Sequence, residues 1–152
     1  MPPRIIPRGP IPAPFIFHHP SPPRPMTGCV PCRITMPLLF LETMKAEFPK
    51  MFDDRSLISF GVPEGWIPLV SLLVRYIQVH CDNSDCPQVV VKQVKEKFGG
   101  LRFYVSGGDA LIQGMITMAE GLSEMTCLFC GHPGVHRPGL WIHMACDRCE
   151  EV

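Results

Sequence analysis

Four cysteines near the C-terminus stand in two C-x-x-C pairs, Cys127/Cys130 and Cys146/Cys149, with fifteen residues between the pairs. A tight C-x-x-C turn can present two thiolates to one ion, and four thiolates form the tetrahedral set that Zn²⁺ prefers. This spacing lies in the range of structural zinc sites. Gly131 follows the first pair and permits the left-handed backbone of a zinc knuckle. The pattern predicts one structural zinc ion, because four thiolates leave no open position for water.

Other chemistry is open to four clustered thiols. Two disulfides would suit an exported protein, and a redox-active C-x-x-C needs a βαβ unit that the flanking pattern does not offer. An iron–sulfur cluster also accepts four thiolates, so iron remains an alternative to zinc. His132, His136 and His143 lie between the pairs and could each replace a cysteine, but four thiols already complete a tetrahedron.

The remaining four cysteines are candidates for a second zinc site. Cys29 and Cys32 form another C-x-x-C pair, and Cys81 and Cys86 are separated by four residues. This second spacing is acceptable for zinc, and His80 stands beside it as a spare ligand. The alternative is that all four are free thiols.

Basic residues and aromatic residues are interleaved in the segment 92–104. If this segment is a β-hairpin, Arg102 and Tyr104 share one face, while Leu101, Phe103 and Val105 share the other. A basic face with an aromatic side chain can hold phosphates and stack a base, which makes this segment a candidate nucleic-acid or partner site. The alternative is that the aromatic residues belong to the core and the lysines keep an edge strand soluble. The candidate residues are Lys92, Lys95, Lys97, Arg102 and Tyr104.

Catalytic motifs are not apparent in the sequence. Asp109, Glu96, His80 and His143 could serve as acids or bases, but no two of them form a recognised motif. The chain has neither a P-loop nor a G-x-S-x-G motif. We therefore expect no enzyme activity and no small-molecule substrate, with a hydrolase or nuclease as the less favoured alternative.

Charge and proline are unevenly distributed along the 152 residues. Residues 1–35 hold four arginines and no acid, whereas residues 36–152 hold ten basic and fourteen acidic residues, so the whole is not a basic nucleic-acid binder. Ten of the eighteen prolines lie between Pro2 and Pro25, which predicts a proline-rich, disordered arm over residues 1–35. No apolar run could span a membrane, and prolines interrupt any secretion signal. The expected location is therefore the cytoplasm, where clustered cysteines are more often ligands than disulfides.

The elements that would position these residues follow from periodicity. A helix is predicted from Met36 to Pro49, and a second, amphipathic helix begins after Trp66, with Leu69, Leu72, Leu73, Tyr76 and Ile77 at helical spacing. A β-hairpin is predicted over residues 90–105 with its turn at Gly99-Gly100, although a helix competes over residues 90–98. Asp109 is expected to cap a third helix whose inward residues are Leu111, Ile112, Met115, Ile116, Ala119 and Leu122.

The predicted fold class is therefore α+β. It comprises two N-terminal helices, a β-hairpin and a third helix within a globular region, residues 36–126. A C-terminal zinc module, residues 127–152, packs on that region. The second cysteine pair could begin a short helix, as in a treble clef, or form a second knuckle, as in a zinc ribbon.

Several short motifs occur together over residues 38–150: GW-x-PL from Gly65, KEKFGGLRFY from Lys95, S-x-x-x-C-x-x-C-G from Ser123 and W-x-x-x-x-C-x-x-C from Trp141. In this combination the chain resembles a family of small uncharacterised bacteriophage and prophage proteins. The resemblance implies a phage or prophage origin, a bacterial host cell as the location and a metal-binding C-terminus. It implies no activity, and it does not extend to the proline-rich arm or to Cys29 and Cys32.

The predicted function is that of a small, zinc-stabilised binding protein without a catalytic role. A host protein, such as a defence or regulatory component, is the favoured partner. The alternative is nucleic-acid binding through the basic-aromatic hairpin. A contiguous apolar patch in the folded protein would favour the protein partner, and a steep salt dependence of binding would favour nucleic acid.

Overall fold

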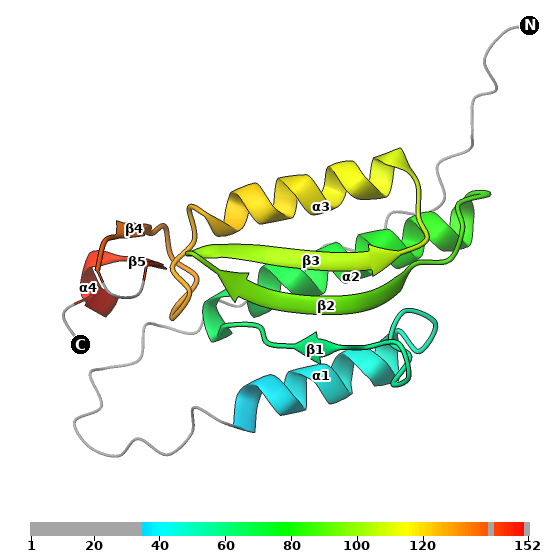
Figure 1. Ribbon diagram of the computed structural model, residues 1–152, viewed down its shortest axis with the longest axis horizontal. Helices are drawn as coiled ribbons and strands as arrows, with labels where there is room; N and C mark the ends of the chain where they lie inside the picture. The colour runs from blue at the N-terminus through cyan, green and yellow to red at the C-terminus, as the bar shows by residue number, and fades with distance from the viewer. Residues whose placement is uncertain (1–34, 140–141, 151–152) are drawn as a thin grey trace, which may run out of the picture. The chain divides into compact units, whose positions relative to one another are not determined.

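The computed structural model describes residues 35–139 and 142–150, all of which belong to a single unit within residues 31–152 (Figure 1). The predicted arm, residues 1–35, lies outside the described residues except for Thr35, and so do Cys29, Cys32 and Trp141.

The described residues combine helices with two small sheets, which confirms the α+β class. The order follows the prediction only in part, because a short strand and a 3-10 turn precede the second helix and a second sheet precedes a terminal helix. The elements are α1 (Thr35–Glu47), β1 (Ser59–Phe60), η1 (Glu64–Trp66), α2 (Ile67–Asn83), β2 (Val90–Lys97), β3 (Gly100–Ser106), α3 (Ala110–Ser123), β4 (Val135–Arg137), β5 (His143–Ala145) and α4 (Asp147–Glu150).

The larger sheet has the strand order β1-β2-β3, with β1 parallel to β2 and β2 antiparallel to β3. The predicted hairpin is therefore confirmed, and the competing helix over residues 90–98 is wrong. One extra residue, Lys92, bulges from β2 between Val91 and Gln93. The core-facing pair Val94 and Phe103 lies directly opposite across the two strands.

The hairpin turn lies one residue earlier than predicted. Phe98 and Gly99 are its two central residues, and both have positive φ angles, 54° and 81°, as a type I′ turn requires. A turn at Gly99-Gly100 would instead pair Phe103 with Glu96. The observed register instead places Phe103 opposite the fully buried Val94, so that two core side chains pack against each other.

A single hydrophobic core joins the sheet to the helices. In Figure 1, α2 crosses behind the hairpin and α3 runs alongside β3. The inward side chains of β2 and β3 meet Ile112 and Ile116 of α3 and Val74 and Ile77 of α2 in one buried cluster. Phe40 of α1 belongs to the same cluster, and its ring centroid lies 5.7 Å from that of Phe60 of β1.

The free edge of β3 is covered by side chains of α3. Ser123 Oγ accepts a hydrogen bond from the Leu101 N–H at 2.8 Å, and Glu120 Oε1 accepts one from the Phe103 N–H at 3.0 Å. Ser123 is completely buried and donates its own hydroxyl proton to the Glu120 carbonyl. An unpaired strand edge can form backbone hydrogen bonds with a strand of another chain. The side chains of Ser123 and Glu120 prevent this at β3, because they occupy two of its backbone N–H groups.

The Ser123→Ala variant is expected to lose about 1–3 kcal/mol of unfolding free energy, because the buried Leu101 N–H would have no partner. Urea denaturation measures this loss. Ser71→Ala is the matched control, since the Ser71 hydroxyl donates only to Ile67 O of its own helix, and its change should stay within about 0.5 kcal/mol. Equal losses in both variants would contradict the role of Ser123 at the strand edge.

The inward faces of α2 and α3 differ from those predicted. In α3, Ile112, Ile116 and Ala119 are buried as expected, but Leu111 and Leu122 are exposed. In α2, the buried residues are centred on Val70, Leu73, Val74 and Ile77, whereas Leu72 and Tyr76 are exposed. Both helices therefore carry a second apolar surface that the core does not use.

Candidate metal centre and helical groove

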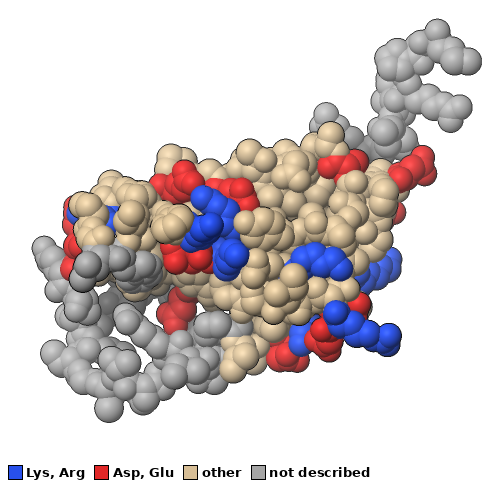
Figure 2. Space-filling model, viewed as in Figure 1, with Lys and Arg blue, Asp and Glu red and all other residues tan. Residues whose placement is uncertain are grey.

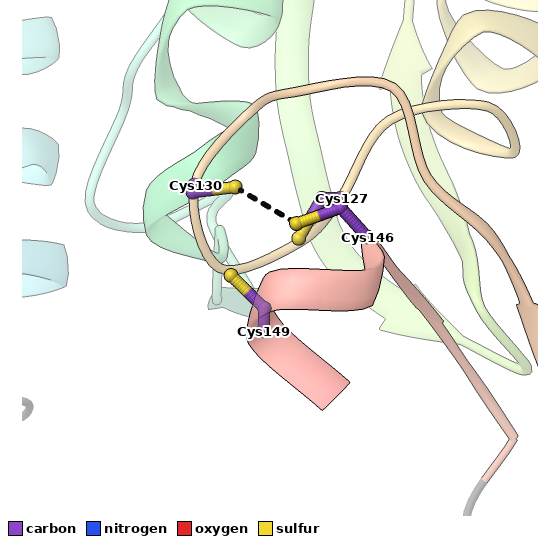
Figure 3. Close-up of side chains that lie close together, drawn as sticks. All are labelled: Cys127, Cys130, Cys146 and Cys149. Atoms are coloured by element: carbon purple, nitrogen blue, oxygen red, sulfur yellow. Dashed lines mark hydrogen bonds between the residues drawn. The ribbon is translucent and has the colours of Figure 1, made fainter. Parts of the chain in front are cut away.

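The sulfur atoms of Cys127, Cys130, Cys146 and Cys149 converge on one point (Figure 3). All four lie within 4.8 Å of one another, and those of Cys130 and Cys146 are 3.6 Å apart. A tetrahedral ion with metal–sulfur bonds of about 2.3 Å places its sulfurs about 3.8 Å apart. The four cysteines could therefore hold one metal ion, and its identity stays a prediction.

The first cysteine pair lies in a tight turn after α3. The Gly131 N–H donates to Cys127 O at 2.9 Å, and Gly131 has the positive φ, 75°, that the sequence predicts for a knuckle glycine. Burial opposes ionisation of Cys127, but backbone N–H groups of Cys146, Cys130 and Phe129 reach its sulfur and lower its pKa to about 7. The turn thus favours a thiolate at this position.

The second pair lies at the start of a short helix. Cys146 precedes α4, Cys149 lies within it, and the Cys149 N–H donates to Cys146 O at 3.0 Å. The antiparallel strands β4 and β5 occupy the segment between the pairs. Of the two structures predicted for the second pair, a short helix and a second knuckle, the short helix is the one observed.

The thiols of Cys130 and Cys149 are harder to ionise than the thiol of Cys127. Burial is the main cause of the raised pKa of both thiols, and the neighbouring sulfurs of Cys127 and Cys146 add to it. Closely spaced thiolates repel one another unless a cation is present, and a coordinated thiol loses its proton outright. The cluster is therefore suited to a divalent cation, which would neutralise the charges that the thiols develop.

The cysteine turn rests on the N-terminal end of α2. The Gly65 N–H donates to Leu128 O at 2.9 Å, and the indole N–H of the fully buried Trp66 donates to Thr126 O at 2.9 Å. Gly65 has no room for a side chain, because a Cβ there would overlap Cys127 O and lie 2.6 Å from Gly131 N. The sequence indicates Gly65 and Trp66 only as parts of a motif at the start of the second helix, and nothing in it predicts their contact with the cysteine turn.

The hairpin turn meets the smaller sheet. A Cβ on Gly99 would lie 3.3 Å from His136 Nε2 and 3.5 Å from the backbone of His143. The three histidines considered as alternative ligands, His132, His136 and His143, do not belong to the four-sulfur cluster. His143 instead lies 3.2 Å from the Glu150 carboxylate.

The predicted second cysteine group is only partly described, because Cys29 and Cys32 lie outside the described residues. Cys86 instead lies near His80 and Asp109. The ring nitrogen Nε2 of His80 lies 2.7 Å from the carboxylate oxygen Oδ2 of Asp109. Burial, followed by the neighbouring Cys81 and the Asp109 charge, raises the pKa of Cys86 to about 11. A catalytic cysteine needs a lowered pKa, so this cluster does not resemble a nucleophilic active site.

The basic-aromatic residues lie on the side of the hairpin that faces away from the core. Lys95 Nζ lies 5.4 Å from the centre of the Tyr104 ring, and Lys95 is paired across the strands with Arg102. Arg102 also lies 3.9 Å from Glu124.

Lys92 occupies the β-bulge, and Lys97 lies over the exposed ring of Phe98 in the turn. In Figure 2, basic and acidic groups alternate across this side of the molecule, so the view shows no uniformly basic surface.

An apolar groove of about 280 Å³ runs between α2 and α3. Leu69, Leu72 and Tyr76 of α2 face Met115, Met118 and Leu122 of α3 across it, and no charged side chain lines it. Leu72, Tyr76, Met118 and Leu122 are between 41% and 63% exposed. Helical periodicity predicts that most of these residues face the core. The sequence feature that could have indicated the groove is the composition of α3, a surface helix with a single charged residue, Glu120, among fourteen.

No protein-family model, curated protein or solved structure matches this chain. The resemblance to phage and prophage proteins therefore stays a prediction that rests on the sequence motifs. Within the described part of the chain, every helix is too short or too polar to cross a membrane.

Proposed function

We propose that this chain is a small binding protein, stabilised by one zinc ion, that holds an amphipathic helix of a partner protein in the α2–α3 groove. The observation that carries the proposal is the contiguous, exposed and uncharged apolar surface between these helices. Large exposed apolar patches are uncommon on soluble proteins and mark sites of interaction. The metal centre supports the fold just beyond the C-terminal end of α3, the end from which Met118 and Leu122 of the groove also come.

Zinc is the metal that the cysteine cluster fits best. Four sulfurs at a separation such as 3.6 Å suit one tetrahedral ion, whereas an iron–sulfur cluster holds its thiolates around several metal atoms. With four sulfur ligands the coordination sphere is full, so the ion would have a structural role. It would join the turn after α3 to α4, where few buried side chains are available.

The shape and chemistry of the groove favour a partner helix. Two neighbouring helices form a concave surface, and an α-helix that presents apolar residues at i, i+3, i+4 and i+7 can fill it. A second copy of the chain would place groove against groove and leave a space between the two concave surfaces. Nucleic acid would bring phosphates to a lining that has no cation.

The partner is proposed to be a protein of a bacterial host. This part of the proposal depends on the predicted resemblance to phage and prophage proteins. A phage product that has no catalytic site can act by occupying a host defence or regulatory protein. Such a partner would contribute the amphipathic helix.

Binding measurements with charge variants test the groove. The full chain is used to capture proteins from bacterial lysate, and a captured protein is purified and its affinity measured directly. Met118→Glu is expected to weaken binding at least 10-fold, because a charge would be buried in the apolar interface. Thr117→Glu introduces the same charge on the preceding, exposed residue of α3 and should bind as the wild type does. Since Met118 is 63% exposed, neither change should lower the melting temperature appreciably.

The open face of the hairpin supports a second candidate function. The stacked pair Lys95–Tyr104 could contact a phosphate and a base, which favours single-stranded nucleic acid. In that case Lys95→Glu would abolish binding, Met118→Glu would not, and affinity would fall steeply with salt. Self-association that Met118→Glu disrupts would also contradict the partner-helix proposal.

A further inference from the structure

A second group of metal-ligating side chains lies where α2 ends and α3 begins. His80 and Cys81 belong to the last turns of α2, Cys86 lies in the following loop, and Asp109 is the N-cap residue of α3. Ligand atoms of His80, Cys86 and Asp109 all lie within 4.8 Å of one another. In Figure 1 this end of α2 and α3 lies opposite the end that carries β4, β5 and α4.

Cys81 lies beside this group, although its sulfur is not among the ligand atoms that all lie within 4.8 Å of one another. The thiols of Cys81 and Cys86 both approach the carbonyl oxygen of Pro87, at 3.8 Å and 3.5 Å respectively. Two thiols, one imidazole and one carboxylate therefore occupy one small region of the surface.

The backbone holds these loops close together independently of any ligand. The Gly108 N–H donates to Pro87 O at 3.1 Å, and a Cβ on Gly107 would overlap Gln88 O. Asp109 Oδ1 accepts the Ile112 N–H at 3.0 Å as a helix cap, which leaves Oδ2 directed at His80. The carboxylate is thus oriented by one oxygen while the other faces the cluster.

We propose that His80, Cys81, Cys86 and Asp109 form a second, separate site for a divalent transition-metal ion, with zinc as the preferred ion. Two thiolates and an imidazole favour zinc over magnesium or calcium, which select oxygen ligands. His80 Nε2 and Asp109 Oδ2 are now at hydrogen-bond distance, 2.7 Å. Nitrogen and oxygen ligands of a tetrahedral zinc ion at about 2.0 Å would lie about 3.3 Å apart, so this pair would have to separate by about 0.6 Å.

The site replaces the pairing that was expected from the sequence. The sequence predicts a second zinc site formed by Cys81 and Cys86 together with Cys29 and Cys32, with His80 as a spare ligand. The structure brings in Asp109, which lies 23 residues after Cys86 and which the sequence predicts only as a helix cap or a possible acid or base. With an ion bound, the C-terminal end of α2 would be fixed to the N-terminal end of α3.

Metal analysis of the purified full chain tests this proposal. Elemental analysis after zinc loading should give two ions per chain for the wild type and one for Cys86→Ser, which leaves the four-sulfur cluster intact. Asp109→Asn is the most informative variant, because asparagine caps a helix as well as aspartate but lacks the charge. It should keep the helix content and weaken uptake of the second ion about 10-fold or more.

Three outcomes would overturn the proposal. One is a wild-type chain that binds a single ion, with no change in Cys86→Ser. Another is loss of the second ion in Cys29→Ser but not in Asp109→Asn, which would restore the pairing expected from the sequence. The last is an intact mass that shows a disulfide between Cys81 and Cys86 in protein purified under reducing conditions.

Discussion

The Cys127→Ser variant is expected to lose its zinc at the four-sulfur cluster and to unfold at least the segment 127–150. Cys127 is completely buried, and backbone N–H groups stabilise its sulfur as a thiolate. Zinc contributes about 10–16 kcal/mol of apparent binding free energy in small zinc peptides, as much as the net stability of about 5–15 kcal/mol of a typical domain. Hydrogen exchange, resolved by segment, and metal content measure the two effects.

Cys86→Ser is the matched control for this prediction, since it removes a thiol from the same chain outside the four-sulfur cluster. It should retain hydrogen-exchange protection in residues 127–150. A strong chelator added to the wild type should reproduce the effect of Cys127→Ser. Full protection of this segment in metal-free protein would show that side-chain packing alone maintains it, contrary to the proposed role of the ion.

The Gly65→Ala variant is expected to be destabilised by about 3 kcal/mol or more and to bind zinc more weakly at the four-sulfur cluster. The added Cβ would overlap Cys127 O and lie 2.6 Å from Gly131 N and 2.9 Å from the carbonyl carbon of Leu128. All three are backbone atoms of the cysteine turn, so no side-chain rotation can relieve the overlap. The turn would have to separate from α2 or distort. Thermal denaturation and competition with a zinc chelator measure the two consequences.

Gly61→Ala provides the control for this substitution. A Cβ on Gly61 would have no atom within 4 Å, and the change in unfolding free energy should stay within about 1 kcal/mol. If Gly65→Ala were as stable as Gly61→Ala and bound zinc normally, the cysteine turn would not depend on its contact with α2. The prediction that packing of Gly65 against the cysteine turn supports the metal centre would then be wrong.

Local sequence features predicted the parts of the structure that depend on neighbours along the chain. Asp109 caps α3 through a hydrogen bond three residues away, and Gly131 adopts the left-handed conformation that its place after a C-x-x-C pair predicts. The hairpin was predicted because a β-branched run and a glycine pair occur together. Its turn was placed one residue too late, since the choice between two adjacent turns depends on burying Phe103 opposite Val94.

Helical periodicity did not distinguish the core from the groove. The apolar residues of α2 and α3 occupy more than one face of each helix, and periodicity does not show which face meets the sheet. Val70 and Val74 are fully buried, while Leu72 and Met118 remain exposed. This choice is made by packing against β2 and β3, whose side chains come from distant parts of the chain. The groove, and with it the proposed partner, therefore became visible only in the folded structure.

The sequence by itself determined which residues can ligate a metal, because C-x-x-C spacing places two thiols on one turn. It also determined the helix starts and the hairpin, which depend on contacts within a few residues. Only the tertiary structure decided that Gly65 and Trp66 support the cysteine turn, that Asp109 joins His80 and Cys86, and that α2 and α3 leave an apolar surface open. The physical reason is that each of these contacts joins segments between about 20 and 65 residues apart, and only the packing of the whole chain brings them together.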